Sequence, residues 1–185
     1  MPRGRPSYLP PQEDYTGTYM ENPGTAYEIQ TLRPTTRESA IRNIWADILH
    51  ESFPRHEGYL VRQETEPIPG RSLRADCKVF HFEQNRNPHR MEFLGIECKQ
   101  GHYETQGNSW DLAQEQLITY LIGFRGSPRV FGAICMGKNV RFYRFFPAQD
   151  DEPATLEEMD ADFIRIDRQP QTVVRRLEYI KNRVS

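Results

Sequence analysis

The sequence predicts an α/β fold in which a central mixed β-sheet is flanked by helices. Segments whose apolar residues recur at helical spacing alternate with segments rich in Val, Ile, Leu and Phe, in the order helix, three strands, helix, strand. The length of 185 residues suits one domain that buries its own core without disulfide bridges. One sheet in this order needs helices to cover it, which gives the fold class.

The composition is that of a globular protein. Hydrophobic residues make up 37% and charged residues 27%, and no apolar run approaches the ~20 residues of a membrane span. The N-terminus lacks the apolar stretch of a secretory signal, and the three cysteines show no CxxC spacing. We therefore expect an intracellular protein, in the nucleus or cytoplasm, with no membrane partner and no disulfide framework.

The net charge of -2 is unevenly distributed along the chain. The segment 36–147 holds fifteen Lys and Arg against thirteen Asp and Glu and is the only net basic part. This excess is far below that of a protein that coats nucleic acid, so binding to nucleic acid stays open on charge alone.

The N-terminal part is expected to lie outside the folded core. Residues 1–34 predict an extended arm, because six prolines interrupt any regular period. A helix is expected next, since Thr35 and Glu38 match a capping box and the following apolar residues repeat at helical spacing as far as Glu51. Apolar, strand-forming segments then predict three strands, at residues 59–63, 73–82 and 91–99.

The remaining elements complete a core that spans residues 35–147. Asn108 and Ser109 can cap a second helix that reaches Phe124. Two strands joined by a tight turn should follow, at residues 130–136 and 140–146. The segment 148–185 predicts an acidic loop and a C-terminal helix that begins at Pro170.

Charged residues on two neighbouring strands form the main functional pattern. A symmetric hairpin would place Asp76 opposite Glu97, and the same register pairs Phe82 with Met91. Lys99 shares the face of Glu97, because side chains alternate along a strand. Opposed carboxylates repel each other unless a positive charge lies between them. The pattern predicts a site for Mg²⁺ or Mn²⁺, in which the lysine orients or deprotonates the water that attacks a phosphodiester.

At these residues the chain resembles the PD-(D/E)XK nuclease superfamily, which has the restriction-endonuclease-like fold. The core of that family has the order αβββαβ, with an acid on the second strand and a (D/E)-x-K triplet on the third. Asp76 matches the acid and Glu97-Cys98-Lys99 the triplet, although no proline precedes Asp76. The resemblance covers the stretch from about residue 35 to residue 146 and implies a metal-dependent nuclease that acts on DNA or RNA.

The resemblance also implies roles for individual residues. Asp76, Glu97 and the Cys98 carbonyl would hold the metal, with Lys99 as the third catalytic residue. Glu38 matches an extra glutamate that many members place on the first helix, and it would be a further metal ligand. Gln116 and Tyr120 resemble the QxxxY motif of the RecB-like and lambda-exonuclease-like branch, and would contact the end of the substrate.

Several alternatives remain open at this stage. Asp76-Cys77-Lys78 is a second (D/E)-x-K match. Glu38 is also explained as the N3 residue of its capping box, and Gln116 and Tyr120 as a polar pair on a helix surface. Cys77 and Cys98 could suggest zinc, but strand alternation puts them on the face opposite Asp76, which favours packing.

A different class of function keeps the same fold without catalysis. The chain would then be an inactive binding or regulatory module that recognises nucleic acid or a protein. In that case the acidic tail and the N-terminal arm would be contact surfaces, the arm through its four tyrosines Tyr8, Tyr15, Tyr19 and Tyr27.

Overall fold

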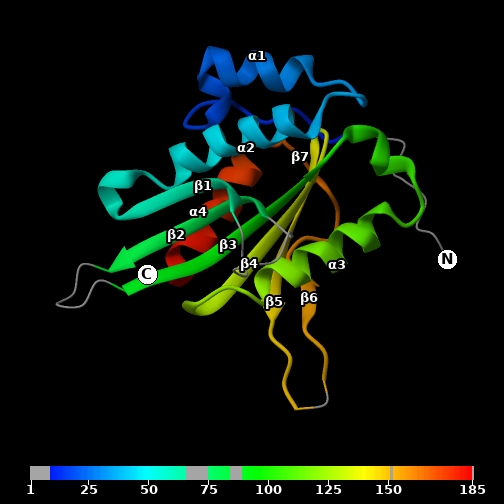
Figure 1. Cartoon of the computed structure of the whole chain (residues 1–185). Helices are drawn as coiled ribbons and strands as arrows, with labels where there is room; N and C mark the ends of the chain where they lie inside the picture. The colour runs from blue at the N-terminus through cyan, green and yellow to red at the C-terminus, as the bar shows by residue number, and fades with distance from the viewer. Residues whose placement is uncertain (1–8, 66–74, 84–88, 151, 185) are drawn as a thin grey trace.

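A mixed β-sheet with helices on both faces forms the centre of the molecule (Figure 1). The computed structural model describes residues 9–65, 75–83, 89–150 and 152–184. The α-helices in these ranges are α1 (Pro23–Thr31), α2 (Glu38–Ser52), α3 (Ser109–Leu121) and α4 (Pro170–Val184). The strands are β1 (Tyr59–Thr65), β2 (Ala75–Glu83), β3 (His89–Lys99), β4 (Gly126–Met136), β5 (Asn139–Phe146), β6 (Thr155–Glu158) and β7 (Ile164–Arg165).

The sheet has the strand order β1-β2-β3-β4-β5-β6, and β7 pairs with β5. Only the β3–β4 pair is parallel among the pairs of the described strands. Helix α3 makes the crossover between these two strands, as parallel neighbours require. The α/β class, the mixed sheet and the order α2-β1-β2-β3-α3-β4 are therefore confirmed.

The helices bury two separate hydrophobic clusters against the sheet. Helices α2 and α4 cover one face, where Ile48 and Leu177 pack with Cys77 on β2. Helix α3 lies on the other face, over β3 and β4, and buries Leu117 against Ile134. Burial of each such side chain contributes roughly 1.5–3 kcal/mol. None of the helices in the described ranges combines the length and apolar composition needed to cross a membrane.

The expectation of an extended arm over residues 1–34 is wrong for the part that follows residue 18. A 3-10 turn (Tyr19–Glu21) leads into helix α1. The Asn22 side chain accepts hydrogen bonds from the backbone N–H groups of Gly24 and Thr25, and proline occupies the first helical position. These are favoured residues for a helix start, and they outweigh the density of prolines around them.

The predicted capping box is also wrong. Helix α2 begins at Glu38 itself, after Arg37, and no side chain caps it. Thr36 instead accepts a hydrogen bond from the backbone N–H of Arg33. The capping box therefore does not explain why a glutamate stands at position 38.

Other boundaries differ by a few residues. Strand β4 begins four residues before the expected Val130, and strand β6 forms within the segment expected to be an acidic loop. The C-terminal helix begins at Pro170 as predicted. Parts of the predicted segments lie outside the described residues: 1–8 of the arm, 66–74 and 84–88 of the core, and residues 151 and 185 of the C-terminal segment.

Candidate active site

The register of β2 and β3 brings the two predicted acids together. Cys77 pairs with Ile96, so that Asp76 and Glu97 are the next residues along this antiparallel ladder. The Asp76 carboxylate accepts a 2.7 Å hydrogen bond from the backbone N–H of Cys98. The two carboxylates are close enough for the charge of Asp76 to raise the pKa of Glu97.

The symmetric hairpin used to predict this register is only half right. A β-bulge between Val79 and Phe80 leaves Phe93 as an extra residue on β3, and Phe82 pairs with Arg90 instead of Met91. The acids lie on the side of the bulge where the predicted register holds. A bulge reverses the face of the sheet to which the following side chains point, so its position decides whether Asp76 and Glu97 share one face.

Glu97 is the most perturbed acid of the site. Its Oε1 atom lies 2.6 Å from Lys99 Nζ, while its Oε2 atom is buried and has no hydrogen-bond partner in the described part of the chain. Burial, followed by the charge of Asp76, raises the pKa of Glu97 to about 7, although Lys99 and the Tyr120 hydroxyl act in the opposite direction. Glu97 therefore titrates near neutral pH.

Asp76 is bound more firmly by its surroundings. Besides the Cys98 N–H group, the guanidinium of Arg42 lies 3.4 Å from Asp76 Oδ1. Burial raises the pKa of Asp76, while the Cys98 N–H bond and then the Arg42 charge oppose that rise. Sequence reasoning missed Arg42, although it stands four residues after Glu38 on α2, the spacing that puts two side chains on one helix face.

Lys99 is a cation enclosed by acids. Burial alone would lower the pKa of Lys99, but the charges of Glu97, Glu38 and Asp76 raise it above its usual value. Lys99 therefore keeps its proton at neutral pH. The group can donate hydrogen bonds and stabilise negative charge, whereas Glu97, with its pKa near 7, is the better proton acceptor.

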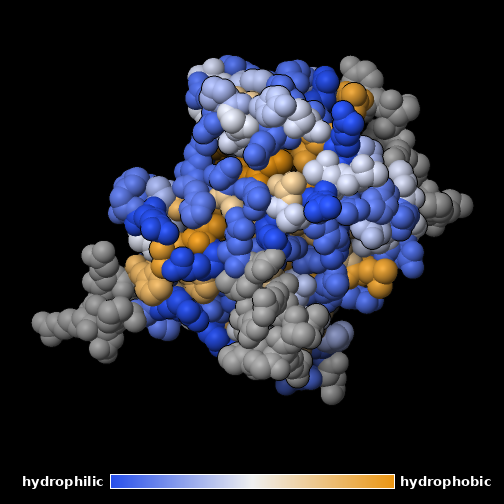
Figure 2. All heavy atoms as spheres, turned by 45° about the horizontal axis from the view of Figure 1, so that its top comes forward, coloured by the Kyte–Doolittle hydropathy of each residue, from blue (hydrophilic) through white to orange (hydrophobic). Residues whose placement is uncertain are grey.

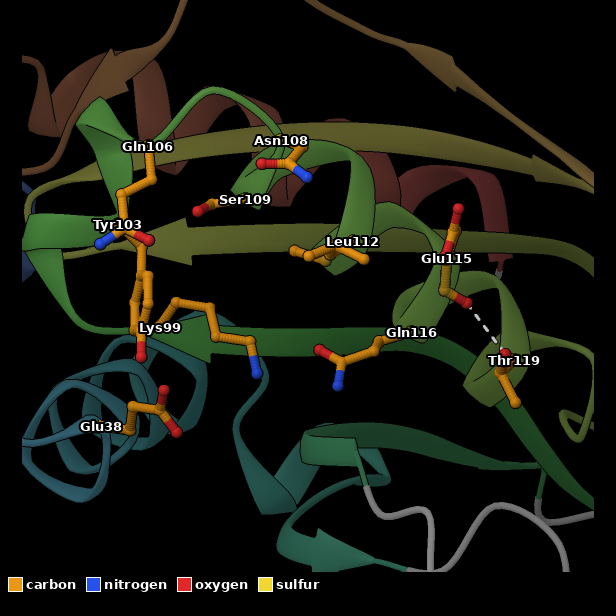
Figure 3. Close-up of a pocket in the computed structure, with 11 residues that line it drawn as sticks. Glu38, Lys99, Tyr103, Gln106, Asn108, Ser109, Leu112, Glu115, Gln116 and Thr119 are labelled. Atoms are coloured by element: carbon orange, nitrogen blue, oxygen red, sulfur yellow. Dashed lines mark hydrogen bonds between the residues drawn. The ribbon is translucent and has the colours of Figure 1, made fainter.

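A pocket of about 530 Å³ opens beside this cluster between α2, β3 and α3. Figure 3 shows the ends of Lys99 and Gln116 facing the same space, with Glu38 below the Tyr103 side chain. Tyr120 does not line the pocket; it is 5% exposed and lies against Glu97, and burial followed by the Glu97 charge raises its pKa. Sequence reasoning missed the contributions of Tyr103 and of the neighbouring polar residues Gln106, Asn108 and Ser109.

The lysine of the second (D/E)-x-K triplet, Asp76-Cys77-Lys78, does not join the candidate active site. Lys78 is 2% exposed, and its Nζ lies 3.4 Å from Glu92 and 4.5 Å from the centre of the Phe124 ring. It therefore forms a buried ion pair away from Asp76 and Glu97. Of the two triplet lysines, only Lys99 has Glu97 as its ion-pair partner.

The three cysteines lie on the other side of the sheet. Cys77, Cys98 and Cys135 are fully buried on three adjacent strands, in or beside the cluster under α2 and α4. Burial raises the pKa of all three thiols, which keeps them protonated. They act as small core residues, and the predicted metal ligand at Cys98 is its carbonyl, not its sulfur.

The residues fit a divalent cation that keeps most of its water. A buried carboxylate oxygen without a hydrogen-bond partner is costly, and a hard cation would satisfy Glu97 Oε2, which has none within the described ranges. The other oxygens of Asp76 and Glu97 already contact Arg42, Cys98 N–H and Lys99. The described residues contain no ready group of three or more His, Cys, Asp or Glu side chains for a metal. One or two carboxylates are enough to hold Mg²⁺ or Mn²⁺, because these ions keep several bound waters. An ion that takes all its ligands from the protein would need more.

Comparison with known proteins identifies no relative, since no family model, curated protein or solved structure matches the chain. The resemblance to the PD-(D/E)XK superfamily therefore stays a prediction that rests on the residues of the site and on the order of the elements around them.

Proposed function

We propose that the protein is a metal-dependent nuclease that hydrolyses phosphodiester bonds of DNA or RNA. The buried Glu97 Oε2 atom beside Asp76, which has no hydrogen-bond partner among the described residues, is the observation that carries this proposal, because a cation held there would give this oxygen a partner. Asp76 and Glu97 would hold Mg²⁺ or Mn²⁺, with the Cys98 carbonyl and Glu38 as further ligands. The bound cation would stabilise the charge that develops on the scissile phosphate.

The side chains of the protein supply the remaining chemistry. Glu97, whose pKa is raised to about 7 without metal, would bind the cation as a carboxylate, because a divalent cation favours the charged form. Lys99 remains charged, orients the attacking water and stabilises the negative oxygens of the phosphate. Gln116, in the pocket, would contact the nucleotide next to the scissile bond, whereas the buried Tyr120, against Glu97, would position that carboxylate.

Cleavage of labelled linear DNA and RNA tests the proposal. We expect wild-type protein to cleave one of them only with Mg²⁺ or Mn²⁺, and Glu97→Gln to abolish cleavage, since an amide keeps the shape but loses the charge. Glu178→Gln, on the exposed side of α4, is the matched control and should retain activity. Cleavage that persists in excess EDTA, or in Glu97→Gln, would show that this site is not responsible.

A catalytically inactive module that binds nucleic acid or protein is the second candidate. It is favoured by the contacts of Asp76, whose oxygens both have partners within the protein, as in a purely structural ion pair. Of the arm tyrosines, Tyr15 and Tyr19 donate hydrogen bonds to carbonyls of the chain itself, whereas Tyr27 is 69% exposed. Calorimetric titration with Mn²⁺ separates the candidates, because only a nuclease site should bind the ion in wild type and lose it in Asp76→Ala.

A further inference from the structure

The sheet face that carries Asp76 and Glu97 continues beyond the candidate active site. On β2, Lys78, Phe80 and Phe82 share the face of Asp76, because side chains alternate along a strand. The paired residues of β1 add Arg62, opposite Lys78, and Leu60, opposite Phe80. Beyond the bulge, β3 turns Arg90 and Glu92 to this side, where Glu92 reaches Lys78.

These residues line a pocket of about 380 Å³, which we call the basic–aromatic pocket; they are Leu60, Arg62, Lys78, Phe80, Phe82, Arg90 and Glu92. Helix α3 packs over β3 and β4, so that it does not close this part of the face (Figure 1). Figure 2 shows apolar surface between strongly hydrophilic residues toward the left of the view.

The charge of the pocket is positive. Three cations face one acid, and Glu92 is fully engaged by Lys78 at 3.4 Å, by Arg90 at 2.9 Å and by the backbone N–H of Arg125 at 3.1 Å. Arg62 and Arg90 extend to the surface, and the Arg90 side chain is 57% exposed. The candidate active site is instead rich in acids, so it would repel a polyanion unless neighbouring cations attracted it.

The aromatic residues give the pocket a second property. Phe82 is half-buried at the pocket wall, and the Arg90 guanidinium lies 4.9 Å from the centre of the Phe80 ring. Aromatic rings beside arginines are a general platform for unstacked nucleotides, which offer both a flat base and a charged phosphate. From Asp76 to Phe82 the strand extends roughly 20 Å, a length of several nucleotides.

We propose that the basic–aromatic pocket binds single-stranded nucleic acid, with Arg62 and Arg90 on its phosphates and Phe82 against a base. This inference rests on the proposed function, because it identifies the substrate of that nuclease site as a single strand that runs along β2 from the pocket to Asp76. A duplex keeps its bases stacked on one another, so it cannot use Phe82 in this way.

Binding of a fluorescent oligonucleotide of about 20 thymidines, measured by anisotropy in EDTA, tests the inference without any cleavage. Each of Arg62→Ala and Arg90→Ala should weaken binding about 3- to 10-fold at 0.1 M salt and reduce the salt dependence of the affinity by about one phosphate contact. Phe82→Leu should weaken binding of the single strand about 5-fold or more and leave binding of a matching duplex unchanged.

Arg183→Ala, an exposed arginine on α4 across the sheet, is the matched control and should bind like wild type. Thermal unfolding of every variant checks that the fold is retained. Equal binding by wild type and the Arg62→Glu/Arg90→Glu double variant would overturn the inference, as would a wild type that prefers duplex. Binding that depends on the pocket in a protein without metal-dependent cleavage would uphold the inference and reject only the nuclease proposal.

Discussion

Glu97 links the chemistry of the site to the stability of the fold. Its pKa rises from an ordinary value of 4.5 to about 7, because folding buries the carboxylate beside Asp76. The folded state therefore holds a proton that the unfolded state has lost between these two pH values. Stability contributed by the protonated form is complete below about pH 4.5 and is lost as the pH rises through about 7.

Glu97→Gln should remove this dependence. In EDTA, we expect the free energy of unfolding of wild type to fall, relative to the variant, by on the order of 2 kcal/mol between pH 5 and pH 8. Urea unfolding at a series of pH values measures the difference, with Glu178→Gln as the exposed control. Parallel curves for wild type and Glu97→Gln would mean that Glu97 ionises normally. Addition of Mn²⁺ at pH 8 should stabilise wild type and Glu178→Gln but not Glu97→Gln.

The two triplet lysines differ in what they contact, and their variants should differ accordingly. Lys99→Ala removes the ammonium 2.6 Å from Glu97 and should lower the cleavage rate at least ~100-fold at saturating metal. Lys78→Met should lower it less than ~10-fold, because Lys78 pairs with Glu92 instead. Single-turnover cleavage measures both rates. The reverse ranking would move the catalytic triplet one strand earlier, onto Asp76 and Lys78.

At the scale of elements, the packing of α3 against the sheet sets the position of Gln116 and Tyr120. Two glycines on the strands allow the helix to approach the sheet closely. A Cβ atom at Gly132 would lie 2.7 Å from the Leu117 side chain, and one at Gly95 would lie 2.9 Å from the Phe124 ring. The pattern of apolar residues predicted the helix, but only the packed structure shows why these strand positions lack a side chain.

Gly132→Ala should push α3 away from the sheet. We expect a loss of about 1–3 kcal/mol in the free energy of unfolding and a lower cleavage rate, because overpacking displaces the helix that carries Gln116 and Tyr120. Urea unfolding and the cleavage assay measure the two effects. Gly107→Ala is the control, since nothing lies within 4 Å of its added Cβ atom. A Gly132→Ala variant as stable as wild type would show that α3 adjusts freely.

The elements that sequence patterns predicted well are those that bury one periodic face. Helices α2, α3 and α4 and the strands of the hairpin have such faces, whereas α1 is nine residues long and buries only Thr25 and Ile29. The β-bulge at Phe93 could not be predicted, because it depends on how Glu92 reaches Lys78 and Arg125. Likewise, strand pairing suggested that Asp76 and Glu97 meet, but Arg42 and Tyr103 join them only through tertiary packing.

At the scale of the whole molecule, the segments outside residues 35–147 share its core. The Tyr19 hydroxyl donates a 2.8 Å hydrogen bond to the Ile166 carbonyl, and Tyr19 and Ile29 are at most 1% exposed. The Glu13 carboxylate accepts hydrogen bonds from the backbone N–H and the hydroxyl of Thr172, at the N-terminus of α4. There it pairs with an N–H group that the helix leaves without a partner, and its negative charge interacts favourably with the positive end of the helix dipole.

Removal of residues 1–34 should therefore destabilise the entire protein. Burial of Tyr19, Met20 and Ile29 contributes roughly 5–8 kcal/mol, which is comparable to the total stability of an ordinary domain. We expect the truncated chain to unfold without a cooperative transition, as followed by the fluorescence of buried Trp45 during urea titration. Glu13→Ala, which removes the cap and the exposed ion pair with Arg175, should cost about 1 kcal/mol and remain cooperative. A truncated chain with the unfolding midpoint of wild type would show instead that the arm is dispensable and that residues 35–185 fold alone.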